Sequence, residues 1–259
     1  MTIRVGYIPY LNMEPFHQGF GPRPLEKDGI RLEFYQMSPR TLGQEAEKGT
    51  IDAGAMSLVD YLKLADTFEP VGSYAIGLKQ QAQSVLLFSK GPLAELEGVC
   101  VVTGDTSTSF RLLQVLLEVR YGRKNVRYGR IASSALFDGE GDALLLIGDE
   151  ALQAKKDGIR GFAVVTDLGQ EWYAWQGTPF VFARWVVRRD LEPKAKAIIS
   201  QLVEKSLNSI LIGSKDELEY WRGFSYLMTP DHEKSIEKFK QLAGTSSFPA
   251  VVSGEATKE

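Results

Sequence analysis

The chain has 259 residues, 44% of them hydrophobic, and this is enough for one large domain or two modest lobes around a sizeable core. Its formal net charge of -3 excludes a broad basic surface that would neutralise nucleic-acid phosphates, so we expect a small-molecule ligand and no nucleic-acid partner. Cys100 is the single cysteine, which excludes an internal disulfide, and its apolar surroundings favour a buried core thiol without a catalytic role.

The first predicted strand runs through the apolar residues 3–8 and is followed almost at once by a helix. Pro9-Tyr10-Leu11-Asn12 interrupts the strand, and Glu14-Pro15 begins the helix. A helix N-terminus in this position presents unpaired backbone N–H groups and the positive end of the helix dipole, which suit a carboxylate. Asn12 either caps this helix or contacts a ligand.

Two further strands, at 31–36 and 53–56, are each followed by a helical segment, and Ser57 stands at the second junction. This repeated order predicts an α/β fold with a mostly parallel sheet, whose ligands bind beyond the carboxyl ends of the strands.

The middle of the chain repeats this pattern twice more. Residues 84–89 form a strand that crosses between lobes, and residues 99–105 form a strand that leads into an amphipathic helix at 109–122. In the hydroxyl-rich junction between them, Thr106 or Ser107 caps the helix, or the junction forms an anion site. A very apolar strand at 142–147 then leads through Gly148-Asp149 into another helix, where Asp149 has the typical position of an N-cap.

The last third begins with a strand at 161–169 and an aromatic cluster that we expect to pack in the core or at a hinge. A strand at 180–187 returns to the first lobe. Helices are predicted at 194–211, 217–227 and 231–242, before a loosely packed tail at 244–259.

Common catalytic signatures are absent from the sequence. Its two histidines, His17 and His232, exclude a histidine-rich metal site, and His17 is expected to be a partly exposed helix residue. The chain contains no Walker loop, dinucleotide GxGxxG or nucleophile elbow. We therefore expect no metal and no cofactor. The residues alone predict a two-lobed α/β ligand binder whose strand-to-helix turns accept carboxylates.

Seven segments, in order along residues 4–242, resemble the chorismate dehydratase family of the futalosine pathway to menaquinone. They are YLNMEPF, IDAGAMSLVDYL, QSVLLFSKGPLAEL, TSTSFRLL, LLLIGDEAL, DLGQEWYAWQGTPFVFARWVVR and FSYLMTPDHEKSIEKF. The resemblance implies a type II periplasmic-binding-protein fold with a ligand cleft between its lobes, and a lyase that dehydrates chorismate to 3-[(1-carboxyvinyl)oxy]benzoate. We place the first part of lobe I at residues 1–84, lobe II at 85–183 and the second part of lobe I at 184–259.

The resemblance also implies site residues. Asn12 and Ser84 are expected to be catalytic, and the residues expected to bind the dianionic substrate are Tyr10, Ser57, Ser107, Thr108, Ser109, Gly148 and Asp149. The segment Ile8-Pro9-Tyr10 departs from many relatives, which have serine before the aromatic residue. None of these motifs contains a convincing base, so we expect the substrate's own enolpyruvyl carboxylate to take the proton.

Localisation and partners follow from simpler observations. No stretch approaches the roughly 20 apolar residues of a membrane span, and no apolar segment of signal-peptide length precedes the first strand. We expect a cytoplasmic enzyme with no membrane partner, and a homodimer is left open.

Three alternatives to the dehydratase are also compatible with this sequence pattern. One is a non-catalytic protein of the same fold that binds small carboxylates. Another is the sister enzyme that acts on cyclic dehypoxanthine futalosine, which should present a catalytic histidine near a strand end. A ligand-sensing domain of a regulator would need a DNA-binding segment.

Overall fold

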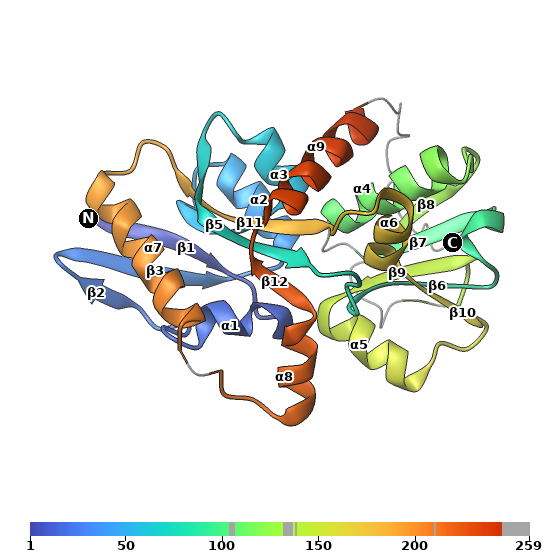
Figure 1. The fold of residues 1–259 in the computed structure, drawn as a ribbon, viewed down its shortest axis with the longest axis horizontal. Helices are drawn as coiled ribbons and strands as arrows, with labels where there is room; N and C mark the ends of the chain where they lie inside the picture. The colour runs from blue at the N-terminus through green and yellow to red at the C-terminus, as the bar shows by residue number, and fades with distance from the viewer. Residues whose placement is uncertain (104–106, 132–136, 138, 210, 245–259) are drawn as a thin grey trace, which may run out of the picture.

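The computed structural model describes residues 1–103, 107–131, 137, 139–209 and 211–244, and these form two lobes, each built around one β-sheet (Figure 1). The larger sheet has the strand order β12-β5-β11-β4-β1-β3-β2. Its strands are β1 (Thr2–Tyr7), β2 (Leu25–Lys27), β3 (Ile30–Gln36), β4 (Ala53–Ser57), β5 (Phe68–Leu78), β11 (Val181–Arg188) and β12 (Phe224–Leu227).

The smaller sheet has the order β10-β6-β9-β7-β8. Its strands are β6 (Val85–Ser89), β7 (Val99–Thr103), β8 (Arg127–Ile131), β9 (Ala143–Ile147) and β10 (Val164–Asp167). Most of these are short apolar runs, and the five residues of β6 and of β9 are all buried. Leu86 and Leu146 pack on one face of this sheet, whereas Leu87 and Leu145 pack on the other, as the alternation of side chains along a strand requires.

Both sheets are mixed, so the expectation of mostly parallel sheets is wrong. β1 is parallel to β3 and β4, and β7 is parallel to β8 and β9. However, β11 is antiparallel to both β4 and β5, and β6 is antiparallel to both β9 and β10. The physical reason is the path of the chain: β5 leaves the larger sheet and β11 returns to it in the opposite direction beside it.

The chain passes twice between the lobes, after β5 and before β11, and the backbone N–H of Leu78 in the first crossing donates to Phe180 O in the second at 2.9 Å. β12 later pairs with β5. The strands of the larger sheet therefore come from residues 2–78 and 181–227, and those of the smaller sheet come from residues 85–167. The boundaries at 84 and 183 remain a prediction.

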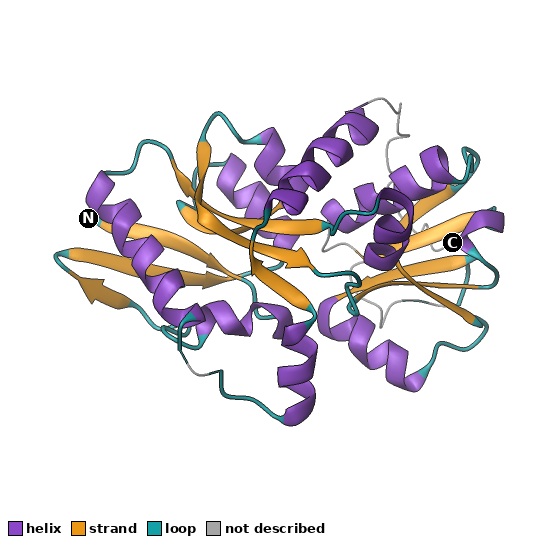
Figure 2. Ribbon diagram, viewed as in Figure 1, coloured by secondary structure: helices purple, strands orange, loops and turns teal. Residues whose placement is uncertain are grey.

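Helices cover the faces of the sheets (Figure 2). They are α1 (Glu14–His17), α2 (Pro39–Glu47), α3 (Leu58–Lys63), α4 (Thr108–Val115), α5 (Gly148–Asp157), α6 (Leu168–Gln176), α7 (Pro193–Leu207), α8 (Lys215–Arg222) and α9 (Pro230–Gly244), with short turns η1 (Leu11–Met13), η2 (Leu93–Glu95) and η3 (Leu116–Arg120). Side chains cap several of them: Ser38 at α2, Ser57 at α3, Asp167 at α6 and a Ser214/Glu217 capping box at α8. None of the helices in the described part of the chain is long and apolar enough to cross a membrane.

Three local expectations, on the helix at 217–227, the aromatic cluster and the C-terminal tail, have different outcomes. The helix predicted at 217–227 ends at Arg222, and residues 224–227 form β12 instead. The aromatic cluster is core packing as expected: Trp172 of α6 is fully buried against Phe180 and Phe239. The predicted C-terminal tail, apart from Gly244 at the end of α9, lies outside the described residues.

Candidate functional site

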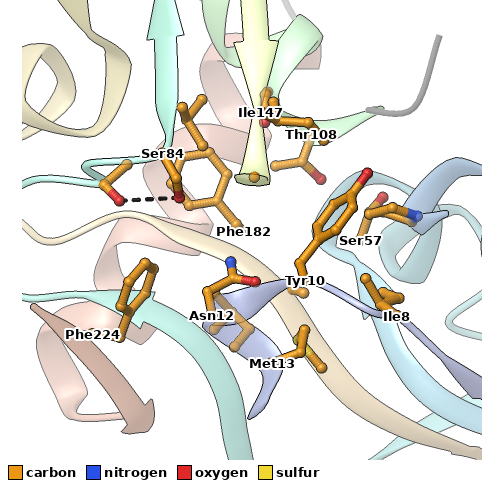
Figure 3. Close-up of a pocket in the computed structure, with 17 residues that line it drawn as sticks. Ile8, Tyr10, Asn12, Met13, Ser57, Ser84, Thr108, Ile147, Phe182 and Phe224 are labelled. Carbon is orange, nitrogen blue, oxygen red and sulfur yellow. Dashed lines mark hydrogen bonds between the residues drawn. The ribbon is translucent and has the colours of Figure 1, made fainter. Parts of the chain in front are cut away.

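A hollow of about 70 Å³ lies where the carboxyl ends of strands from both lobes meet (Figure 3). It brings together these predicted site residues: Tyr10, Asn12, Ser57, Ser84, Thr108, Ser109 and Gly148. The rest of its wall is mostly apolar: Ile8, Met13, Pro39, Ile76, Ala82, Val85, Ile147, Phe182, Ala183 and Phe224.

Asn12 lies in the short turn η1, which begins at Leu11, four residues after the end of β1. Neither η1 nor α1 receives a side-chain cap, so the capping role considered for Asn12 is wrong. Its Oδ1 is buried and has no hydrogen-bond partner among the described residues. Figure 3 shows its amide between Tyr10 and Ser84. A buried acceptor without a hydrogen bond lowers the stability of the folded protein by about 1–3 kcal/mol. A hydrogen-bond donor on a bound molecule would satisfy this oxygen.

Ser84 stands just before β6 and is 1% exposed. Its hydroxyl accepts the phenolic O–H of Tyr220 at 2.6 Å and donates to Ala82 O across a long 3.4 Å. Its backbone carbonyl accepts the N–H of Gly148 at 2.8 Å, which ties the start of β6 to the start of α5.

Ser57 and Thr108 face each other from the two lobes. Ser57 caps α3 by accepting the N–H of Asp60, and it donates its own proton to the Asp60 carboxylate at 2.6 Å. Thr108 Oγ1 accepts the backbone N–H of Val59 at 3.0 Å, and this bond leaves the Thr108 proton available to a ligand. Ser109 is buried beside Thr108.

Gly148 opens α5 with a φ of +60°, in the left-handed region that favours glycine. A Cβ at this position would lie 3.0 Å from the Tyr10 ring. The glycine therefore lets the Tyr10 ring of one lobe rest on the helix start of the other.

Ser107 and Asp149 do not line this hollow. Ser107 donates to the Asp60 carboxylate and borders a second, polar hollow of about 410 Å³ together with Arg40 and Arg111, among others. Burial raises the pKa of Asp60, and the hydroxyls of Ser57 and Ser107 act against that rise. Ser107 forms no side-chain cap to α4, and Thr106 lies outside the described residues.

Asp149 is not an N-cap, because the N-cap position of α5 is Ile147. Its Oδ1 instead accepts the backbone N–H of Leu11 from the other lobe at 3.1 Å. Asp149 thus joins the lobes beside the hollow, and direct contact of Asp149 or Ser107 with a ligand stays a prediction.

Three aromatic residues behind the site were not predicted from the sequence. Tyr220 donates to Ser84, Trp221 Nε1 donates to Leu11 O at 2.7 Å, and the Tyr226 hydroxyl donates to Asn12 O at 3.1 Å. All three come from the segment predicted as one helix. The available signal was the close spacing of three aromatic side chains with polar tips, which usually find a partner when buried.

Neither histidine lines the hollow, and His17 is not the partly exposed residue that was expected. It is 2% exposed and stacks on Tyr7 with ring centroids 4.1 Å apart. Burial lowers the pKa of His17 to about 3. His232 is buried too, with Nε2 2.8 Å from Leu78 O and Nδ1 2.8 Å from Thr229 Oγ1.

Among the described residues that line the hollow there is no Asp, Glu, His, Lys, Arg or Cys, and Tyr10 alone is titratable. The site therefore offers hydroxyl and amide groups on an apolar wall. Such a site can bind and polarise an anion through neutral donors, while a strong protein base is missing from these lining residues.

Comparison with known proteins supplies independent information. A family model described as "Menaquinone biosynthesis" matches residues 3–216. The chain is 29% identical over 218 residues to a chorismate dehydratase of Thermus thermophilus, covering 77% of this chain and 74% of that protein. It is 26% identical over 223 residues to a 1,4-dihydroxy-6-naphtoate synthase of the same organism, covering 81% of this chain and 79% of that protein.

A solved structure agrees with the architecture. The Candida albicans CA3427 gene product, described as having the generic periplasmic binding protein fold, matches with a TM-score of 0.63 at 14% identity, over 96% of this chain and 92% of that one. The two-lobed binding-protein fold predicted from the sequence is confirmed.

Proposed function

Because the chain belongs to the menaquinone biosynthesis family, we propose that it is a lyase that dehydrates chorismate to 3-[(1-carboxyvinyl)oxy]benzoate in the futalosine-dependent route to menaquinone. The relative named chorismate dehydratase supports the choice of substrate. In this scheme the reaction takes place in the cytoplasm and uses neither a metal nor a cofactor.

The observation that carries the proposal is the chemistry of the lining residues. Chorismate is a dianion, and the described lining residues provide neutral donors without a carboxylate that would repel it. Donors held by a folded scaffold stabilise developing negative charge without reorganising, and an apolar wall strengthens each interaction.

The proposed reaction begins at the ring carbon that bears the enolpyruvyl ether. Its proton lies next to a double bond conjugated with the ring carboxylate, and the substrate's enolpyruvyl carboxylate takes it. The electron pair left behind is delocalised toward the ring carboxylate, and hydroxide then departs with its own pair as the ring becomes aromatic. The protein holds the base and the proton in reach of each other, which replaces a protein base.

The side chains have separate roles in this scheme. Thr108 and Ser109, at the start of α4, hold one carboxylate with the helix N–H groups. Asn12 and Ser84 contact the departing hydroxyl or the other end of the substrate. Ser57 offers only an acceptor, since its proton already goes to Asp60.

The histidines separate this function from that of the other relative. An enzyme of the sister reaction is expected to present a catalytic histidine near a strand end, and neither His17 nor His232 is among the residues that line the hollow. The low pKa of His17, which follows from its burial, also makes it a poor base.

The test is to incubate the purified protein with chorismate, follow the ultraviolet change on aromatisation and identify the product by mass spectrometry. We expect a product one water lighter than chorismate. Binding of chorismate without its consumption would refute the lyase and favour a binding protein of this fold.

Asn12→Ala should lower kcat about tenfold, the fold-change of a typical lost hydrogen bond, because the buried Oδ1 would no longer accept a bond from the substrate. The matched control is Asn125→Ala, because Asn125 is exposed in a loop away from the hollow. Unchanged turnover in the Asn12 variant would show that its assigned role is wrong.

A further inference from the structure

We infer that Tyr220 is a positioning residue, which holds the Ser84 hydroxyl so that its proton points to the substrate. The inference rests on the proposed function, because it concerns how the same site presents a donor to an oxygen of chorismate. Tyr220 does not line the hollow, and it acts through Ser84 from behind.

The contact joins distant parts of the chain in a buried place. Tyr220 and Ser84 are 136 residues apart in sequence, are 6% and 1% exposed, and their oxygens are 2.6 Å apart. Tyr220 lies in α8, whose start is fixed by a capping box, and its ring packs in a T-shaped arrangement with the Phe224 ring, with centroids 5.0 Å apart. A short bond between two restrained side chains fixes the orientation of both.

The hydrogen-bond capacity of a serine shows what the bond does. Its hydroxyl has one proton and two acceptor positions, and Tyr220 occupies one acceptor position. Within the described residues, the proton of Ser84 is donated to Ala82 O at 3.4 Å, which is longer than the roughly 2.5–3.0 Å of ordinary O–H···O bonds. A substrate oxygen in the hollow can therefore take this proton at a shorter distance.

The direction of the Tyr220 bond also strengthens Ser84 as a donor. A hydroxyl that accepts one hydrogen bond becomes more polarised and gives a stronger one, particularly away from water. Burial raises the pKa of Tyr220, so its phenol stays protonated and keeps donating at neutral pH.

A double-mutant cycle separates this role from a merely structural one. Tyr220→Phe keeps the ring, and we expect kcat to fall about tenfold, the fold-change of a typical lost hydrogen bond, while KM changes less than twofold. In a Ser84→Ala background the same substitution should have no further effect. Equal losses of kcat in both backgrounds, or no loss in either, would overturn the inference.

The control is Tyr128→Phe, which removes another buried phenol hydroxyl, one without a partner in the described part of the chain. It should keep the wild-type kcat. A loss equal to that of Tyr220→Phe would show that removing any buried hydroxyl slows turnover, and the inference would fall.

A second measurement needs no turnover. In Ser84→Cys the Tyr220 O–H should stabilise the thiolate. The thiol pKa, obtained from the pH dependence of the alkylation rate, should therefore be lower than in the Ser84→Cys, Tyr220→Phe double variant. Cys100 is fully buried and its pKa is raised by burial, so it should not interfere. Equal thiol pKa values would overturn the inference. If the wild-type protein fails to consume chorismate while the difference in thiol pKa is observed, the proposed function is refuted and the contact between Tyr220 and Ser84 is not.

Discussion

His17 should make the folded protein lose stability as the pH falls, before most carboxylates are protonated. Its ring is 2% exposed, its Nδ1 is buried without a partner in the described residues, and burial lowers its pKa from 6.5 to about 3. Below pH 6.5 the unfolded chain therefore takes up a proton that the folded protein refuses. The stabilisation is complete above the unfolded pKa and is lost as the pH falls from 6.5 toward 3.

The size of the effect follows from the two pKa values. Each unit between them corresponds to about 1.4 kcal/mol, so at pH 5 the folded state should be less stable by about 2 kcal/mol than at pH 7 through this group alone. That is a large fraction of the roughly 5–15 kcal/mol by which most domains are stable.

The perturbation is His17→Phe, which keeps an aromatic ring on Tyr7 and cannot take up a proton. Urea unfolding at pH 7, 6 and 5 gives the difference in unfolding free energy between wild type and variant. We expect this difference to move by about 2 kcal/mol in favour of the variant between pH 7 and 5. The chain has only two histidines, so the variant also assigns the ring proton resonances of both by nuclear magnetic resonance.

Two results would refute this reasoning. One is a difference in unfolding free energy that stays constant across the pH range. The other is a His17 ring resonance in the folded protein that titrates between pH 6 and 7.

Two further predictions concern the contacts between the lobes. Gly148→Ala should lower kcat at least tenfold, because it strains a positive φ by about 1–2 kcal/mol and sets a Cβ 3.0 Å from the Tyr10 ring. Gly158→Ala, at the other end of α5, strains a φ of +73° with no atom within 4 Å and should keep wild-type turnover; equal losses in the two variants would contradict the role of the ring contact. Asp149→Ala removes the acceptor of the Leu11 N–H and should raise KM for chorismate about fivefold, and an unchanged KM in steady-state assays would show that this bond does not help to hold the substrate.

Much of the candidate site could be predicted because the junctions obey a local rule. Asn12 follows β1 and Gly148 follows β9, each of which is parallel to neighbours in its own sheet, and both residues line the hollow. Ser84 reaches the same place from the amino end of β6. It can do so because β6 is antiparallel to β9, with Val85 opposite Ile147.

Partners of the predicted hydroxyls and carboxylates could not be predicted from the sequence. Ser107 and Asp149 have the residue types and positions of ligand contacts, yet they bond to Asp60 and to the N–H of Leu11. Those partners belong to the other lobe. Asp60 is 47 residues from Ser107 and Leu11 is 138 residues from Asp149 in the sequence, so no local pattern encodes these contacts.

The position of Tyr226 was missed because long-range pairing overrides a local pattern. The apolar spacing of residues 217–227 is helical, but Phe224 and Ser225 pair with Leu78 and Gly77 in the larger sheet. The hydrogen bonds of that pairing decide the structure of the segment, since intrinsic propensities are small by comparison. β12 consequently carries Tyr226 to the back of Asn12.

This late strand has a consequence for the order in which the protein matures on the ribosome. Every predicted polar contact of the hollow is synthesised by residue 149, but three further hydrogen bonds, to Leu11 O, Asn12 O and the Ser84 hydroxyl, come from side chains of residues 220–226. Synthesis proceeds at about 5–20 residues per second, so the hydroxyls and the amide wait several seconds for their supports. A nascent chain that stops before α8 would contain all the predicted polar contacts of the hollow and still lack the three aromatic side chains that bond to Leu11, Asn12 and Ser84.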